Sequence, residues 1–273
     1  MGKMTVNQKP ANPYQDACKL CGETVEHVFS ARVLGKYEVG YFQCNHCGLM
    51  QTEEPYWLGE AYGEAISSAD TGIMARNLYV MKVVAVFLKL LGGRGRYLDY
   101  GGGHGVFTRL MRDHGFDFYW SDAYAKNLFA RGFSYQKGAL VEGVTAFELL
   151  EHLDEPKRFF RDVLGQMKPE YLIASTELFS GDANPEWKYL YCMTGQHIAF
   201  YQEKTLEMIA LEYGYYYSHF HGMHYFTKER IGNVRIKLIM KSSRFLYPFL
   251  KFPSLVMSDH DFLAQKLETQ HHE

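Results

Sequence analysis

The sequence has 273 residues, of which 47% are apolar and 22% charged, a composition typical of globular proteins with a sizeable core. Lysine and arginine total 29 against 31 aspartates and glutamates, so the net charge is −2. This balance excludes a general electrostatic attraction to nucleic acid or to an anionic membrane. No apolar stretch opens the chain and no run of about 20 apolar residues follows, so we expect a cytoplasmic protein without a signal peptide or membrane span.

Four of the five cysteines form two Cys-x-x-Cys pairs, each followed by a glycine. The pairs are Cys18 with Cys21 and Cys44 with Cys47, and 22 residues separate them. Two intervening residues let a tight turn direct both thiolates at one ion, and two such turns complete the tetrahedral shell that Zn²⁺ prefers. Because no position remains for water, the spacing predicts a structural zinc site rather than a catalytic one.

Residues 11–55, which contain both pairs, are expected to form a zinc ribbon with a strand at 37–43. This segment carries three basic and six acidic residues, so it is a poor candidate for binding phosphate groups. The fifth cysteine, Cys192, stands alone, and we expect it to be a small buried apolar residue.

A glycine-rich loop follows the ribbon. Apolar residues at steps of three and four predict a helix over 70–91, and residues 96–111 then have the pattern of a strand, a loop and a helix. The loop begins at Asp99 and has the form Asp-x-Gly-x-Gly-x-Gly, while Asp122 ends the next expected strand, 116–121. Glycines let a nucleoside cofactor approach the backbone, and an acid after the second strand can bind ribose hydroxyls. Asp99 would repel a pyrophosphate but attract the ammonium and sulfonium of S-adenosylmethionine, which favours that cofactor over NAD.

With this motif the sequence resembles the class I S-adenosylmethionine-dependent methyltransferases over roughly residues 70–227. The resemblance implies an α/β fold, a Rossmann-like doubly wound sheet of seven strands, preceded by the zinc ribbon and followed by a basic and apolar helical extension at 228–273. The third strand is expected at 133–137 and a terminal hairpin at 215–227. The resemblance assigns these residues to cofactor binding: Asp99, Tyr100, Gly101, Gly103, Gly105, Asp122 and Phe147.

Three residues are candidates for catalysis. Glu148 and His152 lie in a Phe-Glu-x-Leu-Glu-His-Leu stretch that in this family lies under the cofactor; a structural hydrogen-bond network is the alternative role. His197 lies in an aromatic segment, 184–201, after the fifth expected strand. Zinc-ribbon methyltransferases of nucleotide-linked deoxysugars are similar in layout, and His197 matches the last histidine of their Tyr-His-Glu-His segment, although the three residues before it, 194–196, read Thr-Gly-Gln. The match implies a general base, and the alternative is a histidine that positions the loop.

We therefore predict a methyltransferase that uses S-adenosylmethionine, carries a structural zinc ion and acts on a small carbohydrate-like acceptor such as a nucleotide-linked sugar. An RNA methyltransferase and a catalytically silent cofactor-binding scaffold are the alternatives. Residues 228–252 hold seven basic residues and one acidic residue among apolar ones. This segment could contact a pyrophosphate-linked acceptor or an anionic membrane, or it could simply pack on the core with its charges in solvent.

Overall fold

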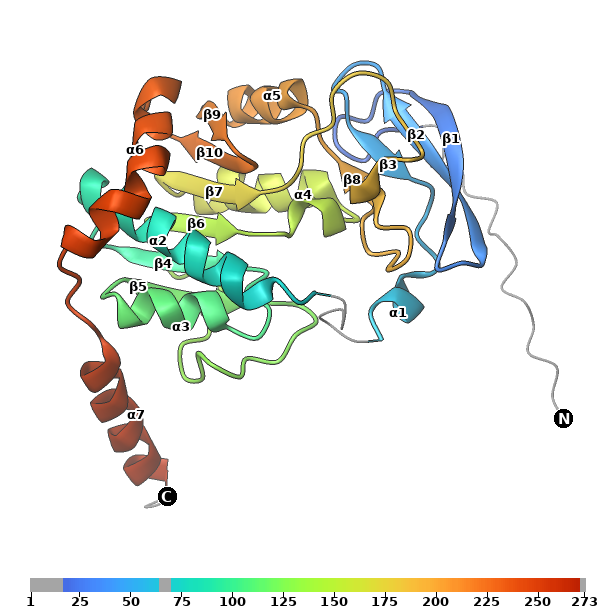
Figure 1. Cartoon of the computed structure of the whole chain (residues 1–273). Helices are drawn as coiled ribbons and strands as arrows, with labels where there is room; N and C mark the ends of the chain where they lie inside the picture. Colours follow the sequence, from blue (N-terminus) through green and yellow to red (C-terminus); the bar gives the residue numbers. More distant parts are fainter. Residues whose placement is uncertain (1–16, 64–69, 271–273) are drawn as a thin grey trace, which may run out of the picture. The chain divides into compact units, whose positions relative to one another are not determined.

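The computed structural model describes residues 17–63 and 70–270, and these divide into two compact units (Figure 1). Unit 1 comprises residues 17–63, 151–157 and 177–205, and unit 2 comprises residues 70–150, 158–176 and 206–270. Residues 11–16 of the expected ribbon and 271–273 of the expected extension lie outside the described part. No helix among the described residues is long and apolar enough to cross a membrane.

Unit 1 is built on an antiparallel sheet of four strands in the order β1-β2-β3-β8. Its elements are β1 (Val25–Val33), β2 (Tyr37–Cys44), β3 (Met50–Thr52), α1 (Leu58–Ala61), a short 3-10 turn (Lys188–Leu190) and β8 (Ala199–Phe200). The strand expected between the cysteine pairs is therefore confirmed as β2. Side chains from the aromatic segment fill the core of this sheet, since Leu190 and Phe200 pack with Tyr41 and Trp57. The Trp57 indole also donates a hydrogen bond of 2.8 Å to the carbonyl of Gly195, which ties that segment in place.

Unit 2 contains a sheet of six strands in the order β5-β4-β6-β7-β10-β9. The strands are β4 (Arg96–Tyr100), β5 (Asp117–Ser121), β6 (Gly143–Ala146), β7 (Tyr171–Ser175), β9 (Tyr216–Phe220) and β10 (Met223–Thr227). The first four are parallel and β10 is antiparallel to both of its neighbours, so the Rossmann-like doubly wound sheet and the terminal hairpin are confirmed. Such a sheet is formed by alternating strands and helices, the pattern seen in the sequence.

The third of the seven expected strands, at 133–137, is reduced to a single parallel bridge between Ser134 and Trp120. The backbone of Trp120 donates to the carbonyl of Phe133 and accepts from the amide of Tyr135, both at 2.8 Å. Gly132 and Gly138, with φ of 87° and 90°, turn the chain at either end of the segment. The described sheet therefore has six strands, because these turns leave only one residue in ladder position.

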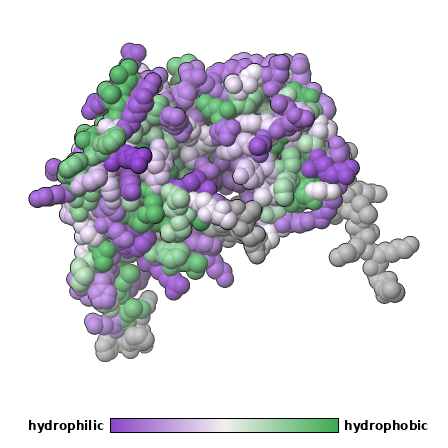
Figure 2. All heavy atoms as spheres, in the orientation of Figure 1, coloured by the Kyte–Doolittle hydropathy of each residue, from purple (hydrophilic) through white to green (hydrophobic). Residues whose placement is uncertain are grey.

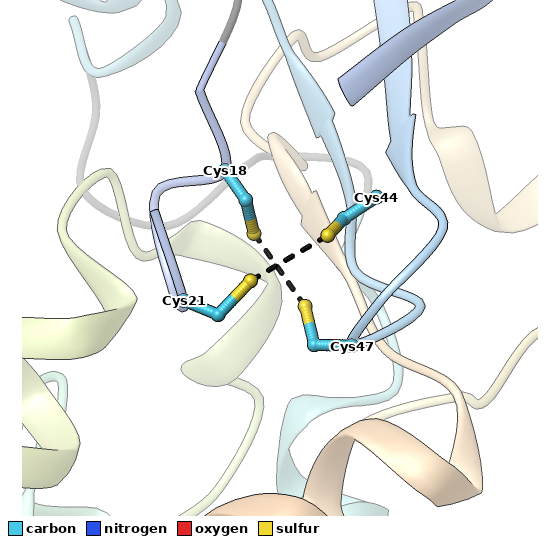
Figure 3. Close-up of side chains that lie close together, drawn as sticks. All are labelled: Cys18, Cys21, Cys44 and Cys47. Carbon is cyan, nitrogen blue, oxygen red and sulfur yellow. Dashed lines mark hydrogen bonds between the residues drawn. The ribbon is translucent and has the colours of Figure 1, made fainter. Parts of the chain in front are cut away.

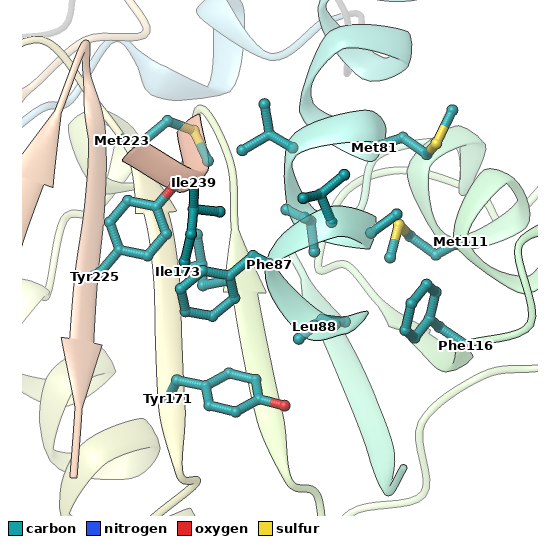
Figure 4. Packing of buried hydrophobic residues seen from close by; sticks show 14 of the residues in the cluster. Met81, Phe87, Leu88, Met111, Phe116, Tyr171, Ile173, Met223, Tyr225 and Ile239 are labelled. Carbon is teal, nitrogen blue, oxygen red and sulfur yellow. The ribbon is translucent and has the colours of Figure 1, made fainter. Parts of the chain in front are cut away.

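Helices cover the sheet of unit 2. They are α2 (Ile73–Leu91), α3 (Val106–Asp113), α4 (Pro156–Phe160) with a π-helical continuation (Arg161–Met167), α5 (Glu203–Tyr213), α6 (Asn233–Leu246) with a 3-10 turn (Tyr247–Phe249), and α7 (Val256–Gln270). As the sequence predicted, α2 ends at Gly92, which has a φ of 73°. Phe87 of α2 packs against Tyr171 and Tyr225 of the sheet, with ring centroids 5.9 and 5.2 Å apart, and Ile239 of α6 joins the same core (Figure 4).

The outer side of α6 is apolar as well as basic. Ile236, Ile239 and Met240 are buried, whereas Leu238 is 62% and Phe245 73% exposed. Figure 2 shows hydrophobic and hydrophilic residues mixed over this helix, at the upper left. The extension therefore packs on the core through one side of α6 and presents apolar side chains among its lysines and arginines on the other.

A buried ion pair attaches α7 to α3. Nε and Nη2 of Arg112 donate to the two carboxylate oxygens of Asp259 at 2.9 and 2.7 Å, and both side chains are buried. Nη1 of Arg112 binds Asp117 at 2.6 Å, and the guanidinium lies 3.7 Å from the ring centroid of Phe133. Burial alone would raise the pKa of Asp259, but the hydrogen bonds and charges of Arg112 and Arg109 together outweigh it, and the pKa falls below its usual value.

We predict that Asp259→Asn lowers the free energy of unfolding by about 3 kcal/mol at neutral pH, because it removes the buried one of the two carboxylates that neutralise the Arg112 guanidinium. A lowered carboxylate pKa stabilises the fold at pH values above the unfolded pKa, about 3.9 for aspartate, and this contribution disappears as pH falls through the folded value. The difference between wild type and variant should therefore shrink below about pH 4. Urea denaturation at several pH values measures it, with Asp261→Asn, an exposed position of the same helix, as the control. Equal losses in both variants would contradict the prediction.

Candidate functional site

The glycine loop of unit 2 is held by hydrogen bonds to the end of β5. The amides of Gly101 and Gly102 donate to the carbonyl of Ser121 at 2.8 and 3.1 Å, and the Trp120 indole donates to the carbonyl of Gly103 at 2.8 Å. The loop therefore has a fixed shape at the carboxyl ends of β4 and β5, where open α/β sheets bind their ligands.

Two of these glycines leave no room for a side chain. A Cβ on Gly101 would lie 2.8 Å from Leu149, and φ is 72° there. A Cβ on Gly102 would lie 2.6 Å from the Asp99 carboxylate and 2.8 Å from the Trp120 ring. Gly103 and Gly105 have φ of 53° and 86°. The loop thus presents bare backbone, as a cradle for a nucleoside cofactor requires.

Asp99, at the end of β4, is only 2% exposed. Its carboxylate accepts hydrogen bonds from the hydroxyls of Thr108 on α3, at 2.9 Å, and Thr145 on β6, at 3.1 Å. Burial raises its pKa to about 6, since the charged form loses its hydration. A buried carboxylate beneath the loop suits a cationic ligand, because a positive charge nearby would favour its ionised form.

Asp122 links the loop to the chain that follows β5. One carboxylate oxygen accepts from the amide of Gly103 at 2.9 Å, and the other accepts from the amides of Tyr124 and Ala125 at 2.8 and 2.7 Å. A carboxylate has about four acceptor positions, so capacity remains for a ribose hydroxyl. These contacts hold the glycine loop against Asp122, the residue that the family resemblance assigns to ribose binding.

The two predicted aromatic cofactor residues lie in the same unit. Tyr100 follows Asp99 on β4, and its ring meets Phe159 edge to face at 5.3 Å. Phe147 follows β6 and meets Phe107 of α3 edge to face at 5.0 Å. The structure therefore places all seven predicted cofactor residues in unit 2, on β4, the glycine loop and the ends of β5 and β6.

Glu148 also belongs to unit 2 and has a strained backbone, with a φ of 48°. The hydroxyl of Ser175, at the end of β7, accepts from its amide at 2.9 Å and donates to its carboxylate at 2.7 Å. The other carboxylate oxygen lies 3.9 Å from Nε of Arg76. Glu148 therefore sits in a polar network that joins the ends of β6 and β7.

His152 and His197 lie together in unit 1, with ring centroids 4.9 Å apart and the rings nearly perpendicular. Nδ1 of His197 lies 2.7 Å from the backbone carbonyl of Tyr189, and Nδ1 of His152 lies 3.0 Å from that of Gln196. A carbonyl only accepts, so each Nδ1 carries a proton and donates it. In the neutral rings the lone pair is then on Nε2.

One residue of this cluster escapes sequence reasoning. Glu151 is completely buried beside the histidines, where its carboxylate accepts a hydrogen bond of 2.6 Å from the hydroxyl of Tyr189. Its backbone carbonyl accepts from the amide of Ile198 at 2.8 Å, which joins residues 151–157 to the aromatic segment. In the sequence, Glu151 is marked only by its position next to His152. That position does not indicate that residues 151–157 belong to unit 1.

The structure brings the four predicted cysteines together at one end of β2 (Figure 3). The sulfur atoms of Cys18 and Cys47 are 3.5 Å apart, as are those of Cys21 and Cys44, and all four are free thiols. In each turn the amide of the following glycine donates to the carbonyl of the first cysteine at 2.9 Å. The contact between Cys18 and Cys47 lowers the pKa of Cys18 to about 5 and raises that of Cys47, so the pair shares one proton in the absence of a cation.

Cys192 lies apart from this cluster. It is only partly buried, which corrects the expectation of a buried residue, because its segment covers the edge of the unit 1 core. Its sulfur lies 3.8 Å from the hydroxyl of Tyr41.

A family model described as a methyltransferase domain matches residues 74–219, more than half of the chain. The chain therefore belongs to the methyltransferase-domain family. It is an S-adenosylmethionine-dependent methyltransferase, and the glycine loop of unit 2 has the backbone cradle and the buried carboxylate that such a cofactor requires. Comparison with curated protein sequences gives no match.

Solved structures of several methyltransferases are similar to this chain. Magnesium protoporphyrin IX methyltransferase from Synechocystis, with bound SAH, is 15% identical with a TM-score of 0.45, over 62% of this chain and 90% of that one. The methyltransferase domain of bacterial CtHen1 is 19% identical with a TM-score of 0.39, over 55% and 98%. Human N-acetylserotonin methyltransferase with SAM is 14% identical with a TM-score of 0.42, over 56% and 52%.

We predict that the affinity for S-adenosylmethionine increases as pH rises through about 6, where Asp99 ionises, by at most about tenfold per pH unit. The ionised carboxylate attracts the cationic cofactor, whereas the protonated one does not. Asp99→Asn, which keeps the shape of the side chain, should bind more weakly and lose this pH dependence. Calorimetric titration with S-adenosylmethionine between pH 5 and 8 measures both. The same slope in wild type and variant would show that another group controls the affinity.

Proposed function

We propose that the protein transfers the methyl group of S-adenosylmethionine to a hydroxyl oxygen of a small carbohydrate-like acceptor, such as a nucleotide-linked sugar. The observation that carries this proposal for the acceptor is the cluster of aromatic and imidazole side chains around His197 in unit 1. We also propose that the four cysteines hold a structural zinc ion.

The part of the proposal that concerns the cofactor depends on residues of unit 2. The backbone of the glycine loop would hold the nucleoside, Asp122 the ribose hydroxyls, and the buried charge of Asp99 would favour the cationic methionine portion. S-adenosylmethionine, when bound, supplies an electrophilic methyl group on its sulfonium. The chain's own task is then to place an acceptor oxygen and to remove its proton.

The part of the proposal that concerns the acceptor depends on His197. Its ring contacts those of Tyr189 and Tyr191, with centroids 4.7 and 5.2 Å away. Tyr191 is half exposed and has a φ of 44°, a strained conformation of the kind that clusters at functional sites. Aromatic faces and hydroxyls suit a polar, uncharged ligand, and Nε2 of His197 is the nitrogen that could take a proton from its hydroxyl. His152 and Glu148 stay candidates for the same role or for positioning.

The charge of the chain speaks against RNA as the acceptor. Phosphate contacts supply most of the affinity for nucleic acid, and residues 11–55 carry twice as many acidic as basic side chains. A local cluster of seven basic residues lies instead in residues 228–252, which include α6, beside exposed apolar side chains such as Leu238 and Phe245. Such a surface favours contact with an anionic membrane or with a pyrophosphate-linked acceptor.

The cysteine cluster fits zinc. Four thiolates at 2.3 Å from one ion form a tetrahedron with edges of about 3.8 Å, close to the 3.5 Å between opposed sulfurs here. All four cysteines are free thiols, so none of them is held in a disulfide. Four protein ligands would fill the coordination shell of the ion and leave no open position. The ion would therefore stabilise the fold of unit 1 and take no part in the reaction.

We predict that Cys44→Ser lowers the zinc content by about one ion per chain and destabilises unit 1, because binding of a structural zinc supplies folding free energy. Cys192→Ser, which changes a cysteine of the same unit outside the cluster, should keep both the zinc and the melting temperature. Atomic emission and thermal denaturation measure the two quantities. Undiminished zinc in Cys44→Ser would overturn the assignment of the site.

We predict that isotope-labelled methyl groups pass from S-adenosylmethionine to the nucleotide-sugar fraction of a cell extract, with RNA, protein and lipid fractions assayed separately. Asp99→Ala should abolish the transfer because it removes the charge that favours the cofactor. His197→Ala should lower the rate by about 10²- to 10⁴-fold while cofactor affinity is kept, the usual loss for a general base. His27→Ala, an exposed histidine of unit 1, is the matched control.

Label found only in the RNA fraction or only in the lipid fraction would contradict the proposed acceptor and indicate that the acceptor belongs to that fraction instead. Label in no fraction, with cofactor binding intact, would support the scaffold alternative. Full turnover of His197→Ala would remove that residue as the base.

A further inference from the structure

Unit 1 contains a second group of side chains able to hold a metal ion. Glu151, His152 and His197 each offer one ligand atom, and these three atoms lie within 4.8 Å of one another. We propose that these residues, here called the His–Glu centre, bind a divalent transition-metal ion, separately from the four cysteines.

The two imidazoles are already oriented as ligands. His197 is fixed through Nδ1 by the carbonyl of Tyr189, and His152 through Nδ1 by the carbonyl of Gln196, with the hydroxyl of Tyr62 3.2 Å from the same nitrogen. Histidines that bind metal commonly donate their second nitrogen to a backbone carbonyl in this way, which sets the tautomer and the direction of the ring. Both histidines therefore have the tautomer with the lone pair on Nε2, the atom that would bind the ion.

The carboxylate supplies an independent observation. Glu151 has an exposed fraction of 0%, and only one of its oxygens is bound, to the hydroxyl of Tyr189. The other oxygen, Oε2, is buried and has no hydrogen-bond partner among the described residues. An unsatisfied buried carboxylate oxygen is costly, and a cation bound there would remove the cost. Tyr189 also links the ligands, because its hydroxyl holds Glu151 and its carbonyl holds His197.

The donor set indicates the type of ion. Two imidazole nitrogens and one carboxylate oxygen are the ligands of catalytic zinc and non-haem iron sites, which keep open positions for water or substrate. Ligand atoms at 2.0–2.2 Å from one ion lie about 3.4 Å apart in tetrahedral geometry, so atoms that now lie within 4.8 Å of one another would have to move closer together to bind one ion. The cysteine site is closed, whereas this one would accept an oxygen of another molecule.

An ion at this centre would change how the acceptor is activated. It would occupy the lone pair of His197 that a general base needs, and it would polarise an acceptor hydroxyl directly. This consequence rests on the proposed function, but the presence of the ion does not, so the two can be tested separately.

Binding of Co²⁺ to the full chain tests the proposal. The cysteine site is first filled with Zn²⁺, loosely bound metal is removed, and Co²⁺ is added while its visible absorption is followed. We expect one further equivalent of Co²⁺ to bind saturably, with weak ligand-field bands and without the intense charge-transfer absorption that thiolate ligands produce. Glu151→Gln, which keeps the volume and the bond to Tyr189, and His197→Ala should each weaken this binding at least tenfold.

His27→Ala is the control and should bind Co²⁺ as wild type does. Zinc content and far-ultraviolet circular dichroism of every variant show whether unit 1 is folded, and a folded Glu151→Gln alone suffices for the test if His197→Ala unfolds. Absence of saturable Co²⁺ binding in wild type, or unchanged binding in Glu151→Gln, would overturn the proposal. Methyl transfer by the metal-free protein would then leave the proposed function standing, whereas Co²⁺ binding without labelling of any acceptor would overturn the proposed function alone.

Discussion

The buried carboxylate of Asp99 is the constraint around which unit 2 is arranged. It is the last residue but one of β4, and its two hydroxyl partners come from α3 and β6. A carboxylate that lies in the interior must be satisfied by hydrogen bonds, and here the partners come from α3, which follows the glycine loop, and from β6, which pairs with β4. The charge is thus fixed beneath a loop whose own shape is held by hydrogen bonds to the end of β5. The cost of burying the charge appears as the raised pKa of Asp99, which a cationic cofactor would reverse.

Unit 1 depends on a different kind of interaction, the pairing of strands that are far apart in sequence. Met50 and Gln51 of β3 pair with Phe200 and Ala199 of β8, and the core between them is filled by side chains from both regions. This pairing brings the aromatic segment back to the cysteine module. A hydrogen bond from the amide of Ile198 to the carbonyl of Glu151 holds Glu151 and His152 close to His197, although the two stretches are far apart in sequence.

Local patterns explain how much could be predicted from the sequence. The glycine loop, α2 with its end at Gly92, β2 and the terminal hairpin follow from spacing and turn residues, and each is confirmed. The third strand, expected at 133–137, is not predicted correctly, because turns at Gly132 and Gly138 bound the segment and only Ser134 reaches ladder position. The burial of Glu151 and its contact with Tyr189 depend on long-range pairing, which no periodicity in the chain records. The close approach of the four cysteines, in contrast, is encoded in their spacing.

Unit 1 is assembled from three separate stretches of chain, the last of which ends at residue 205. During synthesis its sheet can therefore be completed only after β8 has left the ribosome, long after the four clustered cysteines. Contacts between residues so distant in sequence carry a large loop-closure entropy and are expected to form late. The cysteine module therefore depends on residues 177–205 for its last strand and part of its core, and we expect that it could not be moved to another protein without them.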